Sequence, residues 1–140
     1  YIFYIGISSL TDNAKEIILK SKNMLPVTTL KGMYSYIEKV DYIITRGGFN
    51  SITECLFFKK PTIFMNEKFN PEVEENLKIV FDKNLGALMN TNDWKANFTK
   101  RVNKFVTKEV TSIKKNLEKN HFQSNGANQL LKIILKDIKK

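Results

Sequence analysis

The fold of this chain is decided by the sequence Asp41-Tyr-Ile-Ile-Thr-Arg-Gly-Gly-Phe-Asn-Ser-Ile-Thr-Glu54 and by Pro61-Thr-Ile-Phe-Met65 shortly after it. The β-branched run at residues 42–45 predicts a buried strand that ends at a glycine pair. A helix should begin directly afterwards, with Asn50 or Ser51 as its N-cap. The second stretch predicts the next strand, which begins at a proline.

The junction between this strand and the helix has the chemistry of an anion site. Gly47 and Gly48 would let the backbone turn sharply and let a ligand approach the peptide groups without meeting a Cβ. The first N–H groups of a helix are unpaired and lie at its positive end, so a phosphate or diphosphate could bind there, with Arg46 adding charge. Glu54, one turn further, could accept two ribose hydroxyls. The structural alternative is that the glycines only form a turn and Glu54 closes a capping box with Ser51.

Strands and helices alternate from residue 1 to about residue 89. The expected strands are 1–7, 25–29, 42–45, 61–65 and 85–89, and helices are expected between them, ending near residues 20, 39, 60 and 83. This order predicts an α/β fold: an open parallel Rossmann-like sheet with helices on both faces. Ligands bind such sheets beyond the carboxyl ends of the strands, where the loops at Ser8, Thr29, Gly47 and Asn66 would meet.

The segment 91–140 is expected to be a basic helical tail. A helix should follow a cap at 92–93, a second should cover about 109–119, and a third 126–138. The segment holds twelve basic and four acidic residues, so it carries most of the formal net charge of +9. Such a surface could meet anionic lipid, nucleic acid or a protein partner, although a solvated face is the simpler interpretation.

Composition indicates a single globular domain of 140 residues, with 42% hydrophobic and 26% charged residues and no apolar run long enough to span a membrane. The apolar start lacks the features of a signal peptide, and a chain beginning in mid-strand without methionine looks like part of something longer. The single cysteine, Cys55, fits a reducing compartment and buried packing better than a nucleophile. His121 is the only histidine, which argues against a metal site built on His and Cys.

The stretch at 41–54, followed by Lys60-Pro-Thr-Ile-Phe64, resembles the nucleotide-sugar signature of the C-terminal domain of glycosyltransferase family 28. That family includes the peptidoglycan N-acetylglucosaminyltransferase group and related two-domain GT-B enzymes. The likeness is close over about fifty residues and looser elsewhere. It implies that the chain is the C-terminal half of a GT-B fold, lacking its first strand and a glycine-rich loop.

The resemblance also implies roles for individual residues. Glu54 would hold the ribose of UDP, Ser51 would lie near the diphosphate, and Leu30 would contact the uracil through its backbone. The segment 70–76 would reach the donor sugar, but Glu72 stands where glutamine is usual, and an ionised carboxylate cannot donate a hydrogen bond. The full set implied to bind the nucleotide sugar is Leu30, Arg46, Gly47, Gly48, Phe49, Asn50, Ser51, Glu54, Glu72 and Asn76.

The activity implied by the resemblance is metal-independent transfer from a UDP-sugar donor, for which UDP-GlcNAc is one candidate, without a cofactor. The general base would come from an N-terminal acceptor-binding domain, fused or separate, so no residue of this chain is expected to be catalytic. The chain alone should bind donor weakly and transfer nothing. A cytoplasmic location is expected, with peripheral contact at the inner face of the membrane left open and no nucleic acid as partner.

Two alternatives stay open on sequence grounds. A nucleotide-sugar hydrolase of the same architecture would use the same Glu54 and glycine turn, and product analysis would separate it from a transferase. A non-enzymatic module whose basic tail binds nucleic acid or anionic membrane would lose binding steeply with salt and would be indifferent to Glu54.

Overall fold

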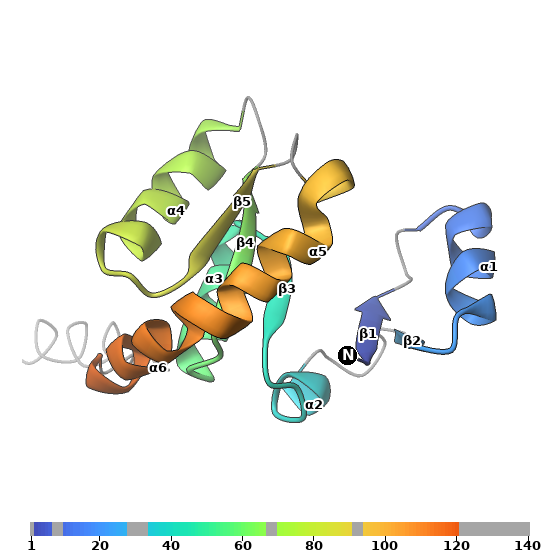
Figure 1. The fold of residues 1–140 in the computed structure, drawn as a ribbon. Helices are drawn as coiled ribbons and strands as arrows, with labels where there is room; N and C mark the ends of the chain where they lie inside the picture. The colour runs from blue at the N-terminus through green and yellow to red at the C-terminus, as the bar shows by residue number, and fades with distance from the viewer. Residues whose placement is uncertain (1, 7–9, 28–33, 67–69, 91–93, 121–140) are drawn as a thin grey trace, which may run out of the picture. The chain divides into compact units, whose positions relative to one another are not determined.

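The computed structural model describes residues 2–6, 10–27, 34–66, 70–90 and 94–120 (Figure 1). The chain divides into two compact units, Tyr1–Val40 and Asp41–Lys140, each with its own parallel sheet. The predicted class, parallel strands alternating with helices, is confirmed in both units. Whether the two units make one domain stays a prediction.

The first unit is a parallel β-α-β arrangement. Strands β1 (Phe3–Gly6) and β2 (Met24–Val27) pair in parallel, and helix α1 (Asp12–Lys20) connects them. The side chain of Thr11 caps α1 by accepting a hydrogen bond from the N–H of Ala14 at 3.4 Å. A short helix, α2 (Tyr34–Ile37), follows in the same unit.

The second unit is built on a three-stranded parallel sheet in the order β3 (Ile43–Arg46), β4 (Thr62–Asn66) and β5 (Ala87–Asn90). Helix α3 (Phe49–Phe57) joins the first pair of strands, and helix α4 (Pro71–Asp82) joins the second. Both crossovers move in the same direction along the sheet, so right-handed connections place α3 and α4 on one face. The central strand β4 begins with a fully buried run, as expected for a strand covered on both faces.

The opposite face of this sheet is covered by one long helical arm (Figure 1). It runs through α5 (Trp94–Lys104), the π-helix η2 (Phe105–Glu109) and α6 (Val110–Lys119). Two separate helices were predicted here, but no glycine or proline interrupts the segment, so a π-turn joins them instead. Phe105 packs edge-on against Tyr42 with ring centroids 5.7 Å apart, and the Nε of Arg101 donates to the carbonyl of Leu88 at 2.7 Å.

Helices α3 and α4 end in the same way. Lys59 and Asn84 both adopt the left-handed conformation, with φ of 50° and 49°. In each case the next residue donates its N–H back into the last turn, which is the Schellman arrangement. These bonds run from Lys60 to the carbonyl of Cys55 and from Leu85 to the carbonyl of Val80, both at 2.9 Å.

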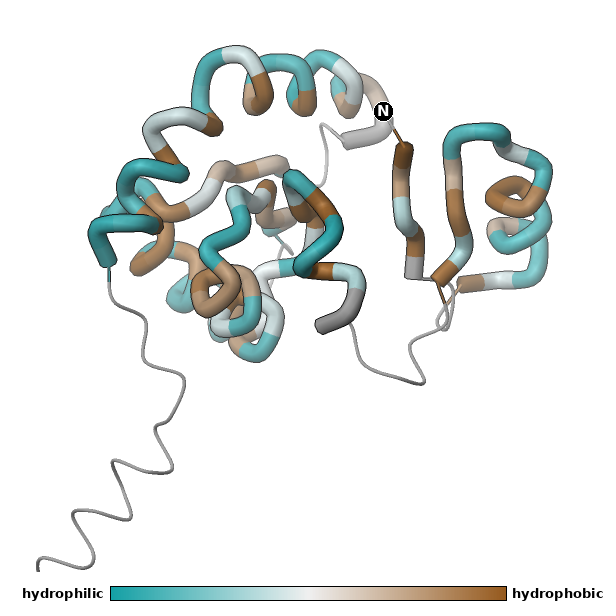
Figure 2. The backbone as a smooth tube through the Cα atoms, turned by 90° about the horizontal axis from the view of Figure 1, so that it is seen from below, coloured by the Kyte–Doolittle hydropathy of each residue, from teal (hydrophilic) through white to brown (hydrophobic). Residues whose placement is uncertain are grey.

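The hydrophobic core of the second unit lies between the two helical layers. It includes Phe64 and Ile63 from the central strand, Leu77 from α4, and Phe105 and Leu117 from the arm. Hydrophobic and hydrophilic segments alternate along the helices, the pattern of helices that bury one side (Figure 2). Among the helices within the described ranges, none combines the length and hydropathy needed to cross a membrane.

Some predicted features lie outside the described residues. These are the loop with Thr29 and Leu30, the loop at Ser8, the helix cap at 92–93, His121, and the last predicted helix at 126–138.

Candidate functional site

The junction between β3 and α3 differs from the prediction at the start of the helix. Gly48, with φ −67° and ψ 147°, is the N-cap, and Phe49 is the first helical residue. The N–H of Ile52 already donates to the carbonyl of Gly48 at 3.0 Å, so the helix is established two to three residues before the expected caps. The prediction that Asn50 or Ser51 caps this helix is therefore wrong.

Because the helix begins earlier than predicted, Ser51 and Glu54 do not form a capping box. Ser51 is the third residue of α3, so its spacing to Glu54 lies inside the helix and satisfies no terminal N–H group. Gly48 has no side chain with which to cap, and the first turn contains no acidic residue. The backbone N–H groups of Phe49, Asn50 and Ser51 precede the first intrahelical bond, so the positive end of α3 is left without a capping side chain.

The two glycines at this junction differ in what surrounds them. Gly47 is buried, and a Cβ placed on it would lie 2.6 to 2.7 Å from the side-chain carbons of Leu77 on α4. A Cβ on Gly48 would meet nothing within 4 Å. The backbone angles of Gly48 are open to any residue, so its glycine is not needed for the turn. Gly47 allows two elements to pack closely, whereas Gly48 leaves open space in front of the helix.

That open space belongs to a pocket of about 490 Å³. It is lined by Gly48, Phe49, Asn50, Ser51 and Glu72. Glu72 comes from the first turn of α4, whereas the other four residues form the start of α3. The fold therefore brings together two segments that the sequence analysis had connected only through the family resemblance. Chemically, the pocket combines hydrogen-bond donors suited to an anion with a carboxylate that can accept from hydroxyl groups.

The other predicted site residues that the structure describes do not line this pocket. Arg46 is exposed at the carboxyl end of β3. Glu54 is half-buried on α3, and within the described ranges its carboxylate has no hydrogen bond or ion pair. Asn76 is half-buried on α4, with its Nδ2 atom buried and without a partner in the described part of the chain. Leu30 lies outside the described residues.

One polar side chain at this edge of the sheet was not singled out from the sequence. Asn66 is the last residue of β4, and its Oδ1 atom is buried without a hydrogen-bond partner in the part of the chain that the structure describes. In the sequence, Asn66 stands out only as the start of a loop. A polar residue at the carboxyl end of a central parallel strand was the available signal, because ligands of open α/β sheets bind at that edge.

Cys55 does not have the chemistry of a nucleophile. Burial raises the pKa of its thiol to about 11, the negative charge of Glu54 acts in the same direction, and a hydrogen bond with Thr62 opposes them in part. The thiol therefore stays protonated near neutral pH, which confirms the expected role in packing. Across the ranges that the structure describes, no three His, Cys, Asp or Glu side chains gather to form a metal site.

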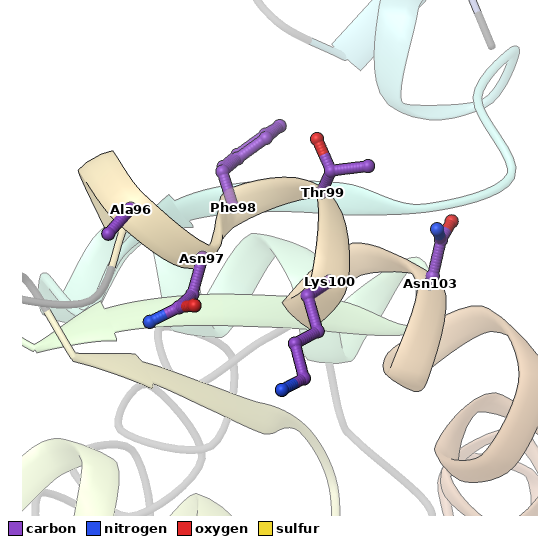
Figure 3. Close-up of a pocket in the computed structure, with 6 residues that line it drawn as sticks. All are labelled: Ala96, Asn97, Phe98, Thr99, Lys100 and Asn103. Atoms are coloured by element: carbon purple, nitrogen blue, oxygen red, sulfur yellow. The ribbon is translucent and has the colours of Figure 1, made fainter.

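A second and larger depression, of about 580 Å³, lies along α5. All six described residues that line it belong to this single helix (Figure 3). Phe98 and Thr99 project to one side of the helix, whereas Asn97 and Lys100 project to the other, so their polar groups do not converge. A binding site needs convergent polar groups, and for that reason the pocket at the start of α3 is the better candidate.

Comparison with known proteins gives two findings. Residues 5–134 match the family model described as the glycosyltransferase family 28 C-terminal domain. A curated protein of Thermosipho africanus (strain TCF52B) is 30% identical over 82 residues and is named UDP-N-acetylglucosamine--N-acetylmuramyl-(pentapeptide) pyrophosphoryl-undecaprenol N-acetylglucosamine transferase. The match covers 57% of this chain and 25% of the Thermosipho protein, so the chain corresponds to only part of that enzyme.

Proposed function

Because this chain belongs to the glycosyltransferase family 28 C-terminal domain family, we propose that it is the donor-binding part of a UDP-sugar-dependent glycosyltransferase. The observation that carries the proposal is the uncapped start of α3, which opens onto a pocket with Glu72 on the other side. The Thermosipho relative, whose printed name specifies UDP-N-acetylglucosamine, supports a UDP-sugar as the donor.

The diphosphate of the donor would bind at the start of α3. Three backbone N–H groups, those of Phe49, Asn50 and Ser51, precede the first helical hydrogen bond and can donate to phosphate oxygens. The open space in front of Gly48 lets the phosphates approach these amides closely. As the bond to the sugar breaks, negative charge builds up on the leaving diphosphate, and the aligned amides stabilise it without a metal ion.

The ribose of the nucleotide would be held by Glu54. The residue is half-buried and its carboxylate has no hydrogen bond or ion pair within the described ranges, so the described part of the chain does not use this carboxylate. A carboxylate has two oxygens and can therefore accept hydrogen bonds from two neighbouring hydroxyl groups. Arg46, at the end of β3, would add positive charge near the diphosphate.

The sugar and the acceptor are the more specific parts of the proposal. We place the donor sugar on the Glu72 side of the pocket, with UDP-N-acetylglucosamine as the first donor to test because of the relative's name. The acceptor and the general base would come from an N-terminal domain, either fused to this chain or on a separate subunit. Residues of this chain would then bind and orient the donor, and none would act as the base.

The test is the substitution Glu54→Ala in the full-length protein. We expect the affinity for UDP, measured by calorimetry, to fall by about 1.5–3 kcal/mol, or roughly ten- to a hundredfold and somewhat more. Glu118→Ala on α6 is the matched control, because Glu118 is exposed and far along the chain from the site, and it should leave UDP affinity unchanged. Equal UDP affinity in wild type and Glu54→Ala would contradict the assignment of the ribose site.

A further inference from the structure

Phe49 is a large apolar side chain with no structural role in the described part of its unit. It is 62% exposed, it does not belong to the hydrophobic core, and it has no ring contact with another aromatic residue in the described ranges. It nevertheless lines the pocket with Ser51 and Glu72. Removing an apolar ring from water is favourable, so an exposed ring in a pocket is available for contact with a ligand.

The position of Phe49 in α3 directs its ring towards the ligand side. Phe49 is the first residue of the helix, and the Cα–Cβ bonds of a helix tilt towards its N-terminus. The side chain therefore extends past the end of the helix, beside the amides that would bind the diphosphate. The group that packs on this ring must be covalently close to the phosphates and must have an apolar face.

Two parts of a nucleotide sugar meet that description, the ribose and the donor sugar. Glu54, the proposed ribose residue, lies five positions after Phe49, which is about 140° around the helix. Phe49 and Glu54 therefore lie on different sides of α3. Glu72, in contrast, lines the same pocket as Phe49. The ring and the Glu72 carboxylate make a pair suited to a sugar, which offers C–H groups on one face and hydroxyl groups at its edge.

We propose that Phe49 is the platform on which the donor sugar packs, so that the chain recognises the sugar separately from the nucleotide. This inference rests on the proposed function, since it assumes a diphosphate bound at the start of α3. The C–H groups of a pyranose carry slight positive charge and pack on the negative face of an aromatic ring. The Glu72 carboxylate across the pocket would then accept hydrogen bonds from hydroxyl groups at the edge of the same sugar.

The experiment compares the binding of two probes, UDP and UDP-N-acetylglucosamine, to the full-length protein by calorimetry. In Phe49→Ala we expect affinity for UDP-N-acetylglucosamine to fall about three- to tenfold, the scale of one aromatic contact, and affinity for UDP to change less than about twofold. Phe49→Trp should retain the affinity for the sugar nucleotide, whereas Phe49→Leu should not. Thermal unfolding should be unchanged in all three variants, because the side chain is exposed.

Phe57→Ala provides the matched control. Phe57 is the last residue of α3 and is 44% exposed, and its ring packs against Phe58 rather than lining the pocket. It should leave the affinity for both probes unchanged. Equal loss of both probes in Phe49→Ala, no loss of either, or tighter binding would overturn the platform role while leaving the proposed function in place. If the wild-type protein binds neither UDP nor its sugar derivative, the proposed function fails and this inference fails with it.

Discussion

Helices α3 and α4 lie on the same face of the sheet, but they begin in opposite ways. Helix α4 is closed by its own residues: the side chain of Asn70 accepts from the N–H of Val73 at 3.4 Å, Pro71 needs no N–H partner, and Glu72 and Glu74 place negative charge in the first turn. Helix α3 has Gly48 as its N-cap, so it has no capping side chain, and it has no acidic residue in its first turn.

The difference shows that the start of α3 lacks stabilising interactions that the start of α4 has. A capping side chain is worth about 1 kcal/mol and each acid in the first turn about 0.3–1 kcal/mol, and α3 has neither. Proteins break such local rules mainly at functional sites. The uncapped start of α3 therefore supports the anion site proposed above. At their other ends, α3 and α4 are closed by the same Schellman arrangement, so only their starts differ.

The largest change in stability is expected from Gly47→Ala. Its Cβ would lie 2.6 Å from the side chain of Leu77, which is packed in the core and 2% exposed. Overpacking of this kind should lower the free energy of unfolding by about 1–3 kcal/mol in chemical denaturation. Gly48→Ala is the matched control and should lose less stability than Gly47→Ala, because its Cβ meets nothing. Equal effects of the two substitutions would show that the glycines do not differ as the packing indicates.

Removal of the α4 cap should have the next largest effect. Asn70→Ala should lower the free energy of unfolding by about 1 kcal/mol, because the N–H of Val73 loses its acceptor. Asn50→Ala is the comparison for α3, and it should change the free energy of unfolding by less than about 0.5 kcal/mol, since Asn50 lies inside the helix and is exposed. A large loss in Asn50→Ala would restore Asn50 as a cap and would remove the contrast between the two helix starts.

A smaller gain is expected at the helix ends. Lys59→Gly should raise the free energy of unfolding by about 0.5–1 kcal/mol, because lysine at a φ of 50° is strained and glycine is not. Asn84→Gly should gain less, because asparagine tolerates the left-handed conformation and the Asn84 side chain also donates to Ser112 at 3.4 Å. Thermal unfolding of both variants tests which substitution gives the larger gain in stability. A larger gain for Asn84→Gly would contradict the assignment of the greater backbone strain to Lys59.

The smallest change in stability is expected from giving α3 the cap that it lacks. Gly48→Asp should raise the free energy of unfolding by only about 0.3–0.5 kcal/mol, yet lower UDP affinity by more than about tenfold, because the new carboxylate takes the amides and repels the diphosphate. Gly48→Asn caps without charge and should lose less affinity. Calorimetry with UDP on both variants separates the effect of charge from that of the cap. Unchanged UDP affinity in Gly48→Asp would place the anion elsewhere.

Local signals predicted the secondary structure of the second unit closely. The apolar run after Pro61 is β4, and the helix expected to end near residue 83 is α4, because in both cases the deciding residues lie close together in the sequence. The start of α3 was predicted wrongly because two signals competed. Ser51 and Glu54 have the spacing of a capping box, but the extended conformation of Gly48 starts the helix earlier.

The sequence by itself determined that parallel strands and helices alternate, that a glycine pair joins a buried strand to a helix, and which family the chain resembles. The first two properties follow from periodicity and turn chemistry, which act over short distances along the chain, and the resemblance rests on the residues at 41–54 and 60–64. Only the tertiary structure decided what each glycine does and which side chains share the pocket. Gly47 faces Leu77, and Glu72 faces the start of α3, because packing on one face of the sheet brings together residues that are far apart in the sequence.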